Sequence, residues 1–209
     1  MAGVAASAVA APTVTPDPVE KCYRDKETVT LRGEGFAPNS QVSIARDGMV
    51  FSQRLMTTPT GAFRGDLKLA QGKGQNRRTY TATDTTNASI TASTSIVVSA
   101  VTVVVRPDTG TPGKVLRIGA RGFTLSKTLY AHIVRKHKSR NVRIGRLKGS
   151  CAKLLAHKRL FSKRTRVGTY RVQFDNKRRY NPKAEVKYAF TVEISVKPKA
   201  SASVWKPVR

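Results

Sequence analysis

The sequence predicts an all-β protein made of two tandem antiparallel β-sandwich domains, because one motif occurs twice and strands alternate on both sides of it. The segment Val29–Phe36 precedes the strand Thr79–Asp84, and the similar segment Val115–Phe123 precedes Thr169–Asp175. Thr79 lies 44 residues after Gly35, and Thr169 lies 47 residues after Gly122. Each copy has the size of a small sandwich, so the repeat predicts two domains of about 100 residues.

The first domain is expected to consist of strands joined by tight turns. Thr28–Arg32 alternates with Val29 and Leu31 inward, and Gly33–Ser40 has turn chemistry. Arg46–Met49 contains Asp-Gly, which predicts a hairpin because both residues tolerate positive φ. Ile90–Val98 alternates strictly, which predicts a last strand with one buried face.

The second domain repeats this pattern of strands. In it, Leu116 and Ile118 are expected to point inward and Arg117 outward, and Val186–Val196 is expected to form one long strand. Neither half contains a convincing helical period. The predicted core positions are Leu31, Phe36 and Tyr80 in the first domain and Ile118, Phe123 and Tyr170 in the second. The two tyrosines open equivalent strands and are expected to be framework residues.

The predicted boundaries are a signal-like or disordered segment at 1–12, domains at 13–99 and 101–198, and a tail at 199–209. Ala8-Val9-Ala10 resembles a cleavage site, although the segment lacks a basic n-region. We therefore expect an exported protein, secreted or associated with the cell envelope. The longest apolar run is too short to span a bilayer, so no transmembrane segment is expected.

Positive charge is concentrated in the second half of the chain. Residues 1–100 contain 11 Lys or Arg and 8 Asp or Glu, a net charge of +3. Residues 101–209 contain 28 Lys or Arg and 4 Asp or Glu, a net charge of +24 of the total +27. No acidic residue occurs between Thr109 and Phe174. This asymmetry favours an anionic partner for the second domain, while a purely solubilising role for the charge stays open.

The chain has two cysteines, Cys22 and Cys151, one in each half. Export would favour their oxidation. Neither domain has an internal pair, so three arrangements stay open: a bridge between the domains, two free thiols, or pairing between molecules. Their spacing along the chain does not decide among them, because disulfide formation depends on geometry.

The segment Gly33–Ser40 followed by Val42 resembles the repeats of bacterial extracellular immunoglobulin-like modules of the IPT/TIG and neocarzinostatin-like types. Ala10–Pro16 resembles the mature start of the latter group, but the chain lacks that group's paired intradomain cysteines. The resemblance covers most of the first domain and the framework of the second. It implies two immunoglobulin-like sandwiches in a nonenzymatic secreted or wall-associated protein, and it names no binding residues.

Catalytic and metal-binding patterns are weak, so we expect no enzyme, no cofactor and no metal. All three histidines lie in the acid-poor stretch, which removes the usual carboxylate partner of a catalytic triad. Zinc ligands would have to come from His132, His137, Cys151 and His157, whose spacings match no compact zinc motif.

The candidate anion-binding residues are therefore the cations clustered on predicted hairpins and turns of the second domain: Arg135, Lys136, Lys138, Arg140, Arg143, Arg146, Lys148, Lys158, Arg159, Lys163, Arg164, Arg166, Arg178 and Arg179. An anionic cell-envelope polymer, such as teichoic acid or acidic polysaccharide, is the expected partner. Nucleic acid is an alternative partner, but the strands offer few exposed aromatic residues for base stacking. Carriage of a small ligand by the first domain is a third possibility, which rests on the family resemblance alone.

Overall fold

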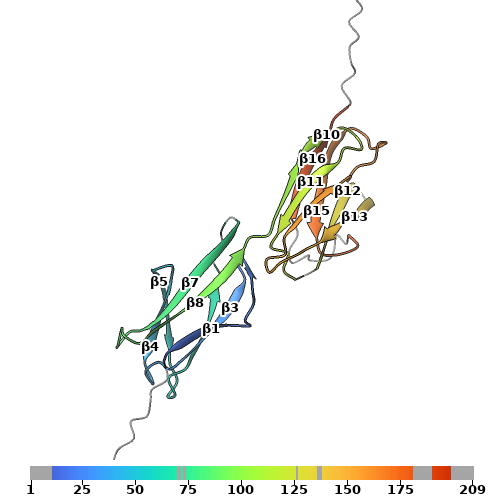
Figure 1. The fold of residues 1–209 in the computed structure, drawn as a ribbon. Coiled ribbons are helices and arrows are strands. Elements are labelled where there is room, and N and C mark those ends of the chain that lie inside the picture. Colours follow the sequence, from blue (N-terminus) through green and yellow to red (C-terminus); the bar gives the residue numbers. More distant parts are fainter. Residues whose placement is uncertain are drawn as a thin grey trace, which may run out of the picture. The chain divides into compact units, whose positions relative to one another are not determined.

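The computed structural model describes residues 11–69, 72, 74–125, 127–135, 138–180 and 190–198. The chain divides between Ala100 and Val101 into two compact units, residues 1–100 and 101–209. The described residues form strands and no helix, which confirms the all-β prediction (Figure 1). They therefore contain no helix that could cross a membrane.

The first unit contains two sheets. A three-stranded sheet has the order β1-β3-β6, and a five-stranded sheet has the order β2-β8-β7-β4-β5. Neighbouring strands are antiparallel except β2 and β8, which are parallel. The strand bounds are β1 Thr13–Asp17, β2 Tyr23–Arg24, β3 Thr28–Glu34, β4 Gln41–Arg46, β5 Met49–Met56, β6 Phe63–Lys68, β7 Gln75–Asp84 and β8 Thr91–Ser99.

The second unit has the same arrangement. Its three-stranded sheet has the order β14-β11-β9, and its five-stranded sheet has the order β10-β16-β15-β12-β13, with β10 parallel to β16. The strand bounds are β9 Thr102–Arg106, β10 Thr109–Gly110, β11 Leu116–Arg121, β12 Thr128–Arg135, β13 Lys138–Arg146, β14 Leu154–Lys158, β15 Gly168–Asp175 and β16 Phe190–Val196. Thus β9, β11 and β14 correspond in sheet position to β1, β3 and β6.

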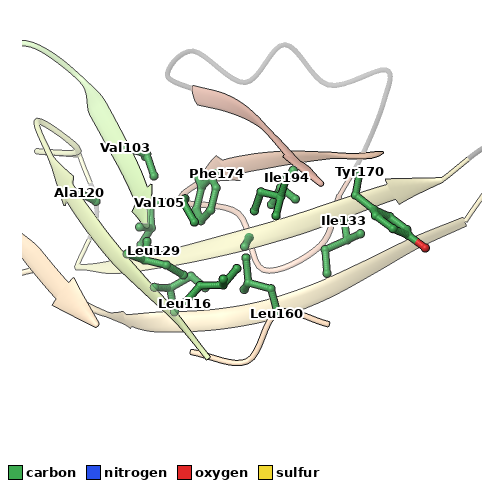
Figure 2. Packing of buried hydrophobic residues seen from close by; sticks show 14 of the residues in the cluster. Val103, Val105, Leu116, Ala120, Leu129, Ile133, Leu160, Tyr170, Phe174 and Ile194 are labelled. Atoms are coloured by element: carbon green, nitrogen blue, oxygen red, sulfur yellow. The ribbon is translucent and has the colours of Figure 1, made fainter. Parts of the chain in front are cut away.

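Each unit has its own hydrophobic core, formed by the inward positions of both its sheets. Figure 2 shows the core of the second unit, where Leu116 from one sheet and Leu129 and Phe174 from the other lie close together. All six core residues predicted from the sequence are buried in the expected unit. A fully buried side chain of this size contributes about 1.5–3 kcal/mol to burial free energy.

The first unit shows where turn chemistry and strand pairing compete. Asp47 and Gly48 have φ of 50° and 83° and join β4 to β5, so the predicted hairpin is confirmed. Gly33, by contrast, is not a turn residue, because it continues β3 and pairs with Phe63. A Cβ at Gly33 would lie 2.0 Å from the Phe63 ring, so this glycine allows ring and backbone to pack together.

Several elements lie beyond the sequence-based prediction. Alternation did not indicate the short strands β2 and β10, and the basic segment at β14 was assigned to turns. The predicted Val186–Val196 strand is described from Phe190 onward, and 181–189 lie outside the described residues, as do 1–10 and the tail at 199–209.

Candidate anion-binding surface

Most Lys and Arg side chains that the structure describes in the second unit are exposed, and none of them pairs with a described acid. Four ion pairs occur among the described residues; three of them lie in the first unit and the fourth joins the buried His132 and Asp175. Within the described part of the chain, therefore, no exposed Lys or Arg of the second unit has an intramolecular salt bridge. Their charge is available to an external anion.

One group of the predicted cations lies around a single depression. Arg140 follows the β12–β13 hairpin, and Arg164 and Arg166 lie in the segment before β15. These three arginines line one open depression of about 380 Å³. The Tyr170 hydroxyl donates a 2.7 Å hydrogen bond to the Arg166 carbonyl oxygen, which anchors the segment that carries both arginines.

A second group lies toward the opposite end of the strands. Arg143 pairs with Tyr130, which in turn pairs with Asp175 at the end of β15. The predicted sites that follow in this direction are Arg146, Lys148, Arg178 and Arg179, all exposed. These eight of the fourteen predicted cations therefore form two groups at opposite ends of the five-stranded sheet.

The remaining predicted cations lie around β14 and the hairpin tip. Lys158 ends β14 and is half-buried, whereas Arg159 and Lys163 are exposed on the connection to β15. Arg135 and Lys138 pair at the hairpin. Lys136 lies outside the described residues, as does His137.

The second unit also contains a buried polar cluster that alternation did not indicate. His132 is fully buried, and its Nε2 donates to Asp175 Oδ1 at 3.0 Å. Its Nδ1 lies 2.8 Å from Asn141 Oδ1, an acceptor that also receives the Tyr180 backbone N–H at 3.4 Å. Both ring nitrogens therefore face an oxygen acceptor, an arrangement that favours the doubly protonated imidazole beside the Asp175 carboxylate.

Electrostatics within this cluster agree with its geometry. Burial opposes the charge on His132, but the hydrogen bonds to Asp175 and Asn141 outweigh it and raise the pKa of His132. Burial likewise opposes ionisation of Asp175, but hydrogen bonds from His132, Gln173 and the Lys177 backbone lower the pKa of Asp175. The cluster therefore links β12, β13 and β15 through a charged pair that is already satisfied.

Sequence reasoning placed the histidines away from any carboxylate, and this was wrong for His132. Asp175 lies 43 positions along the chain from it, and only the pairing of β12 with β15 brings the two together. Among the described residues, no group of His, Cys, Asp or Glu has the arrangement of a metal site. His157 is exposed on β14.

The two cysteines are buried, with 3% of Cys22 and 1% of Cys151 exposed, and neither is a free thiol. Cys22 precedes Tyr23, which pairs with Val98 near the end of the first unit. The Cys151 carbonyl oxygen accepts from the Gly122 backbone N–H, close to the start of the second unit.

The sequence-based prediction missed four cations on the outer face of the sheet β14-β11-β9. This face has an open groove of about 520 Å³, and its charged lining residues are Arg106, Arg117, Arg121 and Lys153. The sequence indicated one of these four cations, because alternation along β11 placed Arg117 outward. The neighbours of Arg117 come from distant parts of the chain, and register alone aligns them.

Comparisons with known proteins give a distant structural likeness and no family. No family model and no curated protein matches the chain. A membrane-anchored protein from Corynebacterium diphtheriae is similar at a TM-score of 0.37 and 9% identity, over 90% of this chain and 57% of that one. Salmonella alpha-2-macroglobulin is similar at a TM-score of 0.39 and 13% identity, over 88% of this chain and 16% of that one. The Yersinia pseudotuberculosis adhesin InvE is similar at a TM-score of 0.33 and 8% identity, over 88% of this chain and 58% of that one. This chain therefore spans less than two thirds of each of these proteins.

Proposed function

We propose that this protein is a nonenzymatic, secreted or cell-envelope-associated protein of two immunoglobulin-like domains, and that its second domain binds anionic envelope polymers. The partner class that we propose is teichoic acid or acidic polysaccharide. The single observation that carries the proposal is the exposed positive charge of the second unit, which has no acidic partner among the described residues.

The topology supports the immunoglobulin-like part of the proposal. In each unit the first strand belongs to the three-stranded sheet and a short following strand runs parallel to the last strand of the five-stranded sheet. The bond from Tyr170 back to Arg166 resembles the tyrosine corner of such domains. Loops that cluster at the ends of a sandwich are also where these domains bind their partners.

The chemistry of the exposed surface favours an envelope polymer over nucleic acid. Sequence-tolerant binding of single strands uses exposed aromatic rings as stacking platforms. In the second unit Phe123, Phe161, Tyr170 and Phe174 are buried in the core. Among the aromatic side chains described in this unit, only Tyr130 and Tyr180 are half-buried, so we expect backbone charge, not bases, to be recognised.

Binding of the full-length protein to purified teichoic acid at several salt concentrations tests this proposal. Affinity should fall steeply with salt, because each engaged cation releases counterions. The triple variant Arg140→Glu, Arg164→Glu and Arg166→Glu should reduce the slope of log affinity against log salt by about three, by analogy with the DNA case.

The matched control changes three exposed cations of the first unit: Arg54→Glu, Arg64→Glu and Lys68→Glu. This variant has the same net charge as the test variant, so a similar loss in both would mean that only total charge matters. Binding that does not respond to salt would contradict the proposal directly. Tighter binding to single-stranded DNA than to teichoic acid would favour the nucleic-acid alternative.

A further inference from the structure

The groove on the outer face of β14-β11-β9 is built from three cross-strand rows. The first row is Arg106, Arg117 and His157; the second is Val104, Gly119 and Leu155; the third joins Thr102 to Arg121, beside Lys153. Two cationic ends therefore flank an apolar centre. Val104 and Leu155 are 48% and 58% exposed and lie on either side of Gly119.

Gly119 keeps the centre of this groove open. A Cβ at this position would meet no atom closer than the Val104 carbonyl oxygen at 4.0 Å. The equivalent residue of the first unit is Arg32, because Gly35-Phe36 and Gly122-Phe123 end the two matching strands. Arg32 forms a salt bridge with Asp17 across the equivalent face. The first unit therefore has an arginine side chain at the position where Gly119 leaves the groove of the second unit open.

The equivalent face of the first unit carries acidic as well as basic residues, whereas the charged residues of the groove are all basic. By strand register Asp17 corresponds to Arg106, and Asp66 corresponds to His157. Glu34 corresponds in the same way to Arg121. Every acid of the first face is therefore replaced by a basic residue, on a framework with the same topology. The difference lies on the surface and not in the core, as expected for a binding function and not for packing.

The groove chemistry defines the shape of its ligand. Arg117 and Arg121 lie four residues apart on β11, or about 13 Å at the rise of a strand. Arginine forks bind phosphate groups with two parallel hydrogen bonds. Arg121 Nε donates to Thr102 Oγ1 at 3.1 Å, which orients its guanidinium. The ligand should therefore carry negative groups at both ends of an uncharged stretch.

The residues between the cationic ends are aliphatic or glycine, and none of the residues that line the groove is aromatic. The groove therefore has no platform on which a base or a sugar ring could stack. A thin, open-chain polyanion fits this surface best. We propose that the groove binds a phosphodiester-linked polyol chain, with its phosphates at Arg106 and Arg117 and at Arg121 and Lys153 and its carbon chain over Val104 and Leu155.

This inference rests on the proposed function and names the ligand class and an additional site for it. The decisive variant is Gly119→Arg in the full-length protein, which copies Arg32 of the first unit. The new arginine fills the groove and adds one positive charge. If the groove is the binding site, affinity should fall, whereas affinity for a diffuse basic surface should rise. The probe is poly(ribitol phosphate), whose five-carbon unit separates its phosphates more widely than glycerol does. With it, we expect a loss of affinity of at least about tenfold, the effect of 1.4 kcal/mol.

The paired variant Arg106→Glu and Lys153→Glu, at two exposed positions, tests the groove even if Gly119→Arg does not fold. We expect a larger loss from it than from Arg64→Glu and Lys68→Glu on the equivalent face of the first unit. Unchanged or tighter binding by folded Gly119→Arg would overturn the groove and leave the proposed function standing. Absence of wild-type binding to any polyanion would overturn both.

Two further probes test the ligand class. Single-stranded DNA and polygalacturonate of matched charge carry rings that the groove does not stack. We expect both to bind more weakly than poly(ribitol phosphate) and to respond little to Gly119→Arg. Equal affinity and an equal response for either probe would overturn the assignment to a polyol phosphate.

Discussion

Replacing Asp175 by Asn should strongly destabilise the second unit, because it removes the carboxylate that is bonded to the buried His132 side chain. Asp175 Oδ1 accepts from His132 at 3.0 Å and from the Lys177 backbone N–H at 2.7 Å. Its Oδ2 accepts from Gln173 Nε2 at 2.7 Å. Removing one partner of a buried charged pair costs about 3–5 kcal/mol. With a urea m-value of about 1–3 kcal/mol/M, the unfolding midpoint should fall by at least about 1 M.

The pH dependence of this loss follows from the two pKa shifts. The raised pKa of His132 contributes stability that is complete below the unfolded pKa of about 6.5 and is lost as pH rises through the folded pKa. The lowered pKa of Asp175 contributes stability that is present above the unfolded pKa of about 3.9 and is lost as pH falls through the folded pKa. The difference between wild type and variant should therefore be greatest between about pH 4 and 6.5.

Urea unfolding of the full-length protein, followed by amide NMR, reports on each unit separately. The control is Asp108→Asn, which changes an exposed carboxylate and should alter stability by no more than about 0.5 kcal/mol. A loss below about 1 kcal/mol for Asp175→Asn, or a loss that is constant from pH 4 to 8, would refute the charged-pair interpretation.

Two further predictions concern the first unit and the cysteines. Burial opposes ionisation of Asp84, but hydrogen bonds from Thr86, Ser40 and Asn87 lower its pKa to about 2. Asp84→Asn should therefore lower the free energy of unfolding of the first unit by on the order of 2 kcal/mol at pH 7. In acid titrations the difference between variant and wild type should disappear as pH falls toward 2. A difference that does not depend on pH would show that packing is responsible. Cys22 and Cys151, neither of which is a free thiol, are predicted to form one bridge within the chain. The unreduced, denatured protein should then contain no reactive thiol and run as a monomer; two thiols per chain or a disulfide-linked dimer would exclude this bridge.

Local sequence patterns were sufficient for the core and for several turns. Alternation along a strand directly assigns inward and outward faces, which is why Ile118 and Tyr170 were predicted as buried and Arg117 as outward. The Asp47-Gly48 turn was predictable because positive φ restricts the residues that tolerate it. Gly33 was misassigned for the same local reason, since its close packing against Phe63 depends on a strand 30 residues away.

Local patterns and composition were enough to predict an all-β chain, its buried strand faces and the excess of positive charge in its second half. Which of these charges share a surface depends on the fold, because cross-strand register joins residues that no local period relates. The fold places His132 against Asp175, gathers eight of the predicted cations into two groups and aligns Arg106, Arg117 and Arg121 around an open glycine. Composition is a sum over the chain, whereas a binding site depends on which strands lie side by side.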